Sequence, residues 1–312
     1  MEGIPHVAIE NRDSVILKQY EAQLTRTDRI SVGQHECEIF DLSPDSHSGV
    51  EPVIFVPGLG KTLLDYKATL FELYKRGHRI LSITPPTLDE SKLGVNNGSP
   101  SLQMSPPIFQ LRAEALQKLC ATKGLVHIDV VTHSEGILHA VIAAGKDATL
   151  FRNFVFIAPP GFATHSAPTI LKRALSNAVQ GMTSERRNQP PLSSPRPAYS
   201  MKNAKAVIGS VIYPGQVSII DEVQSLRDQG HQVAVIAYED DWMLPLAEFK
   251  KILVPSEDGM SPVVDRFGSL PGTHDGLRES PKVSGLHVSG VLATLQGGQT
   301  SLQEGTSNRY RV

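Results

Sequence analysis

The stretch IDVVTHSEG, residues 128–136, predicts a strand that turns directly into a helix. Ile128–Thr132 has the apolar character of a buried strand, and an Ala-rich helix is expected from Gly136 to Ala144. A serine on so sharp a turn has its hydroxyl pushed out of the sheet, and the residue two positions later must be small because strand and helix nearly touch. Gly136 meets that requirement. Ser134 is therefore a candidate nucleophile, although a serine that opens a helix is more often a simple N-cap.

Short apolar strands and single helices alternate on both sides of this turn. Because strands that read as unbroken apolar runs are buried on both faces, the pattern predicts a mostly parallel sheet with helices on both faces, an α/β class. A hairpin from Arg29 to Leu42, broken at Gly33, precedes the sheet. The other strands are expected at Val53–Val56, Arg79–Thr84, Phe154–Ala158, Val233–Tyr238 and, more weakly, Val263–Phe267. The helices are expected at residues 63–74, 108–119, 218–230 and 246–253, with a last one around Val288–Leu295.

The alternation of predicted strands and helices ends at Pro159 and resumes near Ser218. We therefore expect a core domain of residues 1–160 and 216–296, an inserted cap of residues 161–215, and a disordered tail of residues 297–312. One cap helix is expected to direct its apolar face inward, with Lys172 and Arg173 outward. The residues expected on that apolar face are Ile170, Leu171, Ala174, Leu175 and Ala178.

The charge of the chain is nearly balanced, but the expected cap is basic. The formal net charge of −2 over 312 residues, without a long basic block, argues against nucleic acid as the main partner. The cap charges have two interpretations: a solvated lid face, or attraction of an anionic ester or an anionic lipid surface. Residues 161–217 hold one acid, Glu185, against Lys172, Arg173, Arg186, Arg187, Arg196, Lys202 and Lys205.

Targeting and cofactor signals are missing from the sequence. The N-terminus has no basic segment followed by an apolar core, as a signal peptide would have. No stretch of the sequence is apolar over the ~18 residues that spanning a bilayer requires. We therefore expect a cytoplasmic protein without a transmembrane segment. No His-x-x-x-His, Cys-x-x-Cys or GxxxxGK[ST] spacing occurs, so we expect neither a metal site nor a cofactor site. Cys37 and Cys120 are expected to be buried, reduced thiols.

A serine hydroxyl becomes a nucleophile only when an imidazole takes its proton and a carboxylate fixes the tautomer of that imidazole. After the strand VAVIAY comes the carboxylate loop Glu239-Asp240-Asp241, and after the strand VVDRF comes the turn PGTHDG with His274. Any of the three acids is eligible by position. The other histidines, among them His133, His139 and His287, are expected to be surface or structural residues.

Four motifs in this order resemble those of the α/β-hydrolase superfamily. VPGLG at residues 56–60 resembles its oxyanion loop, THSEG its nucleophile elbow, YEDDWMLP its acid loop with a proline four residues after the acid, and PGTHDGL its histidine loop. The resemblance spans about Arg29 to Leu295. It implies a catalytic triad of Ser134, Asp241 and His274. Thr132 stands where the family more often has glycine, and Pro57 where it often has histidine.

The same resemblance assigns an oxyanion hole to backbone N–H groups. Glu135 matches the first donor, and Leu59 the second, with Gly60 as the alternative. The implied function is a serine hydrolase that cleaves a carboxylic ester, a thioester or a lactone. The alternatives are an acyltransferase with the same triad and a ligand-binding receptor or scaffold on this fold. The expected partner is a small ester-like molecule, anionic or lipid-like if the cap charges attract it.

Overall fold

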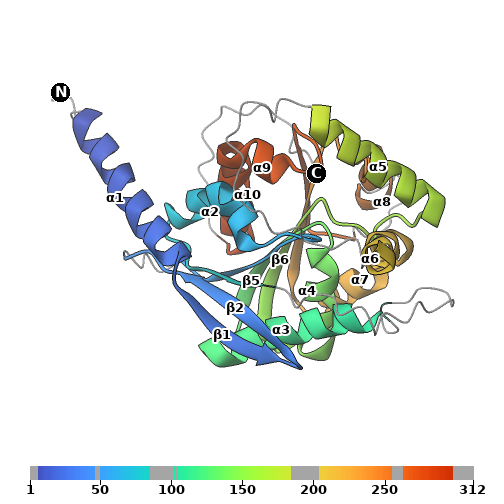
Figure 1. Ribbon diagram of the computed structural model, residues 1–312, viewed down its shortest axis with the longest axis horizontal. Helices are drawn as coiled ribbons and strands as arrows, with labels where there is room; N and C mark the ends of the chain where they lie inside the picture. The colour runs from blue at the N-terminus through green and yellow to red at the C-terminus, as the bar shows by residue number, and fades with distance from the viewer. Residues whose placement is uncertain are drawn as a thin grey trace.

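The sheet of this protein is mixed at one edge and parallel elsewhere. The computed structural model describes residues 6–45, 50–84, 102, 105–183, 204–254 and 263–297. Their eight-stranded sheet has the order β1-β2-β4-β3-β5-β6-β7-β8 (Figure 1). Pairing is antiparallel for β1 with β2 and for β2 with β4, and parallel for all the other neighbours. The strands are β1 (Thr27–Val32), β2 (His35–Leu42), β3 (Val53–Val56), β4 (Ile80–Ile83), β5 (Ile128–His133), β6 (Phe151–Ile157), β7 (Gln232–Tyr238) and β8 (Arg266–Leu270).

Helices cover both faces of the sheet, as the sequence predicts. One face packs against α2 (Lys67–Tyr74), α9 (Gly276–Glu279) and α10 (Pro281–Leu295), through the apolar cluster that holds Phe55 and Ile236. The opposite face packs against α3 (Pro107–Lys123), α4 (Gly136–Lys146), α7 (Ile220–Asp228) and α8 (Leu246–Leu253). Short 3₁₀ helices, η1 (Leu63–Tyr66) and η3 (Ala148–Leu150), precede α2 and β6. Cys37 and Cys120 are buried free thiols, as expected.

A helix that the sequence pattern does not predict, α1 (His6–Leu24), precedes the hairpin and extends away from the sheet in Figure 1. Its C-terminal half docks through Ile16, Tyr20 and Leu24, which follow one another four residues apart and lie on one helix face. The Tyr20 hydroxyl, on a side chain that is 2% exposed, donates a hydrogen bond to the Lys67 carbonyl at 2.7 Å. Among the side chains of this helix that the structure describes, these three form the apolar contact with the core.

Two C-terminal elements differ from their expected positions. The last strand begins at Arg266 and not at Val263, because Val264 packs into the apolar cluster ahead of the strand and Asp265 ties this point to β7. The strand proper contains Gly268 and Ser269 and is half-buried at the sheet edge, so its apolar pattern is weak. The last helix begins at Pro281, seven residues before the expected Val288, since proline is favoured at the first helical position.

Two helices lie between β6 and α7, in the segment expected to be a cap. They are α5 (Ala167–Thr183) and α6 (Ala204–Gln216), and they pack against each other. The side chain of Ile170 on α5 fills the space beside Gly215, where an added Cβ would lie 2.7 Å from it. Residues 184–203 and, apart from Gly297, the predicted disordered tail lie outside the described residues. No helix in the described part of the chain is both long and apolar enough to cross a bilayer.

Candidate active site

Ser134 lies at the turn between β5 and α4, in a backbone conformation that side chains rarely adopt. Its φ is +51°, in the left-handed region, and its N–H donates to the Ile157 carbonyl at 2.9 Å. A Cβ added to Gly136 would lie 2.6 Å from the Val56 carbonyl oxygen, so only glycine allows α4 to pass this close to β3. Strained turns persist where the surrounding structure fixes them, and this one presents the Ser134 hydroxyl at the carboxyl end of the sheet.

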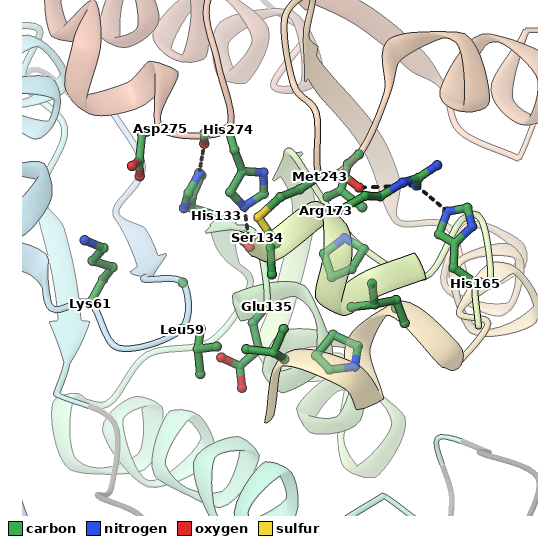
Figure 2. A pocket seen from close by; sticks show the side chains of 18 of the residues that line it. Leu59, Lys61, His133, Ser134, Glu135, His165, Arg173, Met243, His274 and Asp275 are labelled. Atoms are coloured by element: carbon green, nitrogen blue, oxygen red, sulfur yellow. Dashed lines mark hydrogen bonds between the residues drawn. The ribbon is translucent and has the colours of Figure 1, made fainter. Parts of the chain in front are cut away.

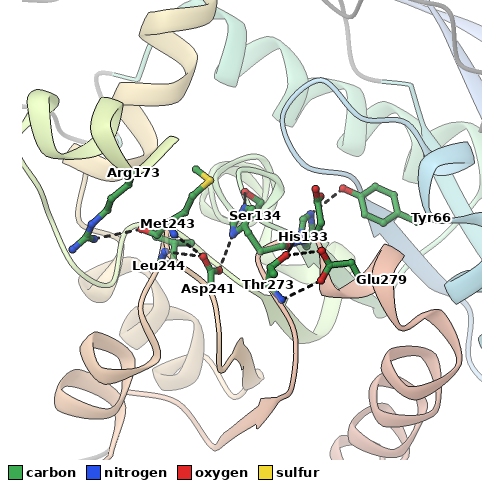
Figure 3. A network of polar contacts seen from close by, with 11 residues as sticks. Tyr66, His133, Ser134, Arg173, Asp241, Met243, Leu244, Thr273 and Glu279 are labelled. Carbon is green, nitrogen blue, oxygen red and sulfur yellow. Dashed lines mark hydrogen bonds and ion pairs between the residues drawn. The ribbon is translucent and has the colours of Figure 1, made fainter. Parts of the chain in front are cut away.

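The structure brings Ser134, His274 and Asp241 into one chain of hydrogen bonds (Figure 3), and Figure 2 shows the contact between His274 and Ser134. The distance from His274 Nε2 to Ser134 Oγ is 2.8 Å, and that from His274 Nδ1 to Asp241 Oδ2 is also 2.8 Å. Because a carboxylate only accepts hydrogen bonds, Nδ1 carries the proton in the neutral ring. Nε2 is then an acceptor and receives the hydrogen bond of the Ser134 hydroxyl.

The charge of Asp241 sets the basicity of His274. Burial by itself lowers the pKa of His274, since it disfavours the imidazolium. The negative charge and the hydrogen bond of Asp241 outweigh burial and hold the pKa of His274 above its usual 6.5. The ring is therefore a stronger base than a free imidazole, at a position where it contacts the serine hydroxyl.

Of the three acids that the sequence offers, Asp241 is the one that contacts His274. Asp241 is 3% exposed, and its second oxygen, Oδ1, accepts hydrogen bonds from the N–H groups of Met243 and Leu244 at 2.8 and 2.9 Å (Figure 3). Asp240 and Glu239 are exposed at the end of β7. The three contacts fix the carboxylate of Asp241 in a single orientation.

His133, one of the histidines expected to be surface or structural residues, is buried and its ring packs against that of His274. It is wholly enclosed, with Nε2 at 2.9 Å from the His274 carbonyl oxygen and Nδ1 at 2.9 Å from the Tyr66 hydroxyl. Burial, helped by the nearby charge of His274, lowers the pKa of His133 to about 4, so its ring is neutral. Nε2–H then donates to the carbonyl, and Nδ1 accepts from Tyr66. This histidine thus anchors the backbone of the base.

A second anchor of the histidine loop comes from α9. The Glu279 carboxylate accepts hydrogen bonds from the Thr273 N–H at 3.1 Å and from the Thr273 hydroxyl at 2.8 Å (Figure 3). No sequence motif marks this contact. An acid six residues after a threonine is common, and only the fold shows that the two side chains of this pair close the turn around His274.

Leu59 and Glu135 line the same cavity as Ser134 (Figure 2). Within the described ranges, the N–H groups of these two residues donate to no protein acceptor. Gly60, the alternative second donor, is not among the residues that line the cavity. Unpaired N–H groups next to a nucleophile are the donors that a developing oxyanion requires.

The cavity above Ser134 has a volume of about 320 Å³, near the lower limit of ~300–1,000 Å³ for small-molecule sites. Its walls come from the oxyanion loop, the elbow, the acid and histidine loops, and helices α5 and α6 (Figure 2). The apolar part of the wall is formed by Leu59, Pro160, Ile170, Ala174, Val211, Pro214, Met243 and Leu244. In the described part of the chain, no three His, Cys, Asp or Glu side chains are grouped to hold a metal ion.

Charged residues lie in the wall at two places. Lys61 and Asp275 lie on one side (Figure 2). Burial raises the pKa of Asp275, but the charge of Lys61, with those of neighbouring cations, outweighs burial and lowers that pKa below its usual value. On the other side Arg173 contacts Glu248 at 2.7 Å and His165 at 2.9 Å.

The expected orientation of helix α5 was wrong in part: Lys172 is exposed, as expected, but Arg173 is not directed outward. Arg173 points inward to Glu248 and to the Met243 carbonyl, whereas Leu171 and Leu175 are 40% and 68% exposed. Ile170 and Ala174 line the cavity as expected. The ion pair with Glu248 on α8 and the contact with the Met243 carbonyl hold Arg173 against the acid loop. Arg186, Arg187, Arg196 and Lys202 lie outside the described residues, so the attraction of an anionic partner stays a prediction.

The fold of this chain is similar to that of several solved structures over most of its length. An enol-lactonase from Burkholderia xenovorans LB400 has a TM-score of 0.60 at 14% identity, over 86% of this chain and 100% of that chain. A thermophilic esterase from Thermogutta terrifontis has a TM-score of 0.59 at 17% identity, over 86% of this chain and 99% of that chain. An α/β hydrolase from a Medee basin deep-sea metagenome library has a TM-score of 0.57 at 12% identity, over 91% of this chain and 100% of that chain. No protein-family model and no curated protein matches the sequence.

Proposed function

We propose that this chain, which has the α/β-hydrolase fold, is a serine hydrolase that cleaves a carboxylic ester, a thioester or a lactone through an acyl-enzyme on Ser134. The observation that supports the proposal is the hydrogen-bonded series Asp241–His274–Ser134, with 2.8 Å at each step, beside a cavity with two unpaired backbone N–H groups. Nucleophile, base and orienting acid have the geometry that acyl transfer requires.

In the first half of the reaction, Ser134 Oγ attacks the carbonyl carbon while its proton passes to His274 Nε2. Asp241 stabilises the imidazolium that forms and keeps the Nδ1 proton in place. The negative charge that develops on the carbonyl oxygen is stabilised by the N–H groups of Leu59 and Glu135. His274 then gives its proton to the leaving oxygen or sulfur, and the acyl group stays on Ser134.

In the second half, water attacks the acyl-enzyme. His274 Nε2 takes a proton from the water, whose oxygen bonds to the acyl carbon, and then returns that proton to Ser134 Oγ as the carboxylic acid leaves. The small volume of the cavity favours a short acyl group. We further propose that residues 161–215 act as a cap, because side chains of α5 and α6 form one wall of the cavity.

The test is turnover of p-nitrophenyl esters of increasing acyl length by the wild type and by Ser134→Ala. The wild type should hydrolyse the short esters best, and the variant should lose ~10⁴-fold or more in kcat with an unchanged fold. Turnover of none of the esters by the wild type, or persistence of activity in the variant, contradicts the proposal. Transfer of the acyl group to an added alcohol in preference to water would favour the acyltransferase alternative.

A further inference from the structure

A buried ion pair lies directly behind the elbow. Arg112 on α3 places Nη1 at 2.8 Å from Oε1 of Glu135, the residue that follows the nucleophile. The two side chains are 5% and 3% exposed. The other oxygen of the carboxylate, Oε2, has no hydrogen-bond partner within the described residues, and neither has Arg112 Nε. The pair therefore has a single close contact and is not the two-point contact that makes an arginine–carboxylate pair strong.

The position of this carboxylate conflicts with the proposed chemistry unless a cation compensates it. The N–H of Glu135 is a proposed donor to the oxyanion, and the carboxylate of the same residue lies within one side-chain length of that N–H. Figure 2 shows Glu135 and Leu59 together on the cavity wall below Ser134. Buried charges interact more strongly than charges in solution. An uncompensated carboxylate here would repel the negative charge that develops on the substrate oxygen.

Arg112 supplies the compensating charge. The only other titratable group with a close contact to the carboxylate in the described part of the chain is His139, with Nε2 at 3.6 Å from Oε1. Burial lowers the pKa of His139, so this ring is neutral near pH 7. A buried ion pair with one contact is a weak source of stability, because the desolvation of both charges offsets their attraction.

We propose that Arg112 is a positioning residue for the oxyanion hole: it neutralises and holds the Glu135 side chain, so that the N–H of Glu135 stabilises the oxyanion without opposition from its own carboxylate. The inference rests on the proposed hydrolase function. It assigns a role in the reaction to a side chain on α3 that does not line the cavity and carries no motif.

The test is a comparison of Arg112→Met, Arg112→Lys and the double variant R112M/E135Q. Arg112→Met should lower kcat for the best ester by about 10- to 100-fold with little change in KM, below the ~10²–10³-fold loss of a whole oxyanion donor. Arg112→Lys keeps the charge and should stay within a few-fold of the wild type. The double variant removes both charges and should recover most of the loss.

A second readout separates this role from a structural one. Phenylboronic acid forms an anionic tetrahedral adduct with a serine nucleophile, so its inhibition constant should rise in Arg112→Met in parallel with the loss of kcat. The melting temperature of each variant shows whether it is folded at the assay temperature. The inference is overturned if the loss of kcat in the variants parallels the fall in their melting temperatures while the inhibition constant of phenylboronic acid stays unchanged.

The remaining outcomes are also decisive. Full activity in Arg112→Met, or failure of the double variant to recover when both proteins are folded, overturns the role of Arg112 and leaves the hydrolase proposal intact. If Arg112→Met does not fold, a loss of about 10-fold or more in kcat of folded Arg112→Lys, which keeps the positive charge, overturns it as well. Absence of esterase activity in the wild type removes the hydrolase proposal and this inference together.

Discussion

Asp241→Asn tests how the acid orients the base, because the structure leaves the new amide one favourable orientation. Asp241 Oδ1 accepts the N–H groups of Met243 and Leu244, so the asparagine oxygen must stay there. Turning the amide over would leave two buried donors unpaired, at ~1–3 kcal/mol each, or about 2–6 kcal/mol in all. The NH₂ group therefore faces His274 Nδ1 and imposes the tautomer with the proton on Nε2. That nitrogen cannot accept the proton of Ser134.

The expected loss follows from the tautomer alone. A reversed tautomer costs ~10⁴-fold in kcat, which at 1.36 kcal/mol per decade is about 5 kcal/mol of barrier. The assay is kcat on the best p-nitrophenyl ester, with the melting temperature as a check of folding. Asp240→Asn is the matched control, because Asp240 is adjacent and exposed, and this variant should keep its activity. Near-normal turnover in Asp241→Asn, or the larger loss in Asp240→Asn, refutes the reasoning.

Three further predictions concern His274 and two residues on either side of Ser134, His133 and Gly136. Because only neutral His274 accepts the serine proton, kcat/KM should rise with pH, and the midpoint of the rise should lie above 6.5, since Asp241 raises the pKa of His274 against the effect of burial. Gly136→Ala should destabilise the protein by about 1–3 kcal/mol and lower kcat, because its Cβ would lie 2.6 Å from the Val56 carbonyl oxygen. His133→Phe should lower kcat by up to ~100-fold, the equivalent of the ~1–3 kcal/mol that an unpaired buried carbonyl at His274 costs.

Matched variants show whether these effects are specific. Gly145→Ala lies in the same helix as Gly136, its Cβ meets nothing within 4 Å, and it should not destabilise the protein. His78→Phe removes another buried histidine, whose ring contacts the Ser289 hydroxyl, and this variant should not change kcat. A rise in activity centred below pH 6.5, equal effects of the two glycine changes on stability, or equal kcat losses in the two histidine variants would contradict the respective predictions.

The inner parallel strands were predictable because they are buried on both faces and have an almost continuous apolar sequence. β3 and β5 are buried at every position, and their expected bounds hold to within one residue. β8 lies at the sheet edge and contains glycine and serine, so its bounds were wrong by three residues. The apolar residues by which the described part of helix α1 docks are Ile16, Tyr20 and Leu24, and a periodicity search over the whole helix does not detect so short a pattern.

The proposed catalytic residues were predictable for a topological reason. Ser134, Asp241 and His274 each follow a strand of the parallel part of the sheet, and the carboxyl ends of such strands meet at one edge. The residues that support them were not predictable. His133 meets the carbonyl of His274 across 141 positions of sequence, and Arg112 reaches Glu135 from a neighbouring helix. Neither contact follows from spacing, since each depends on how separate elements pack.

The central claim is that Ser134 is the nucleophile, and the most direct measurement is the site of covalent labelling by a fluorophosphonate. Intact-mass and peptide mass spectrometry of the wild type should show one adduct per chain, on the peptide that contains Ser134. His274→Ala should react far more slowly, because the hydroxyl then has no base at 2.8 Å. Absence of an adduct on the folded wild type, an adduct on a different residue, or equal rates for the wild type and His274→Ala would contradict the claim.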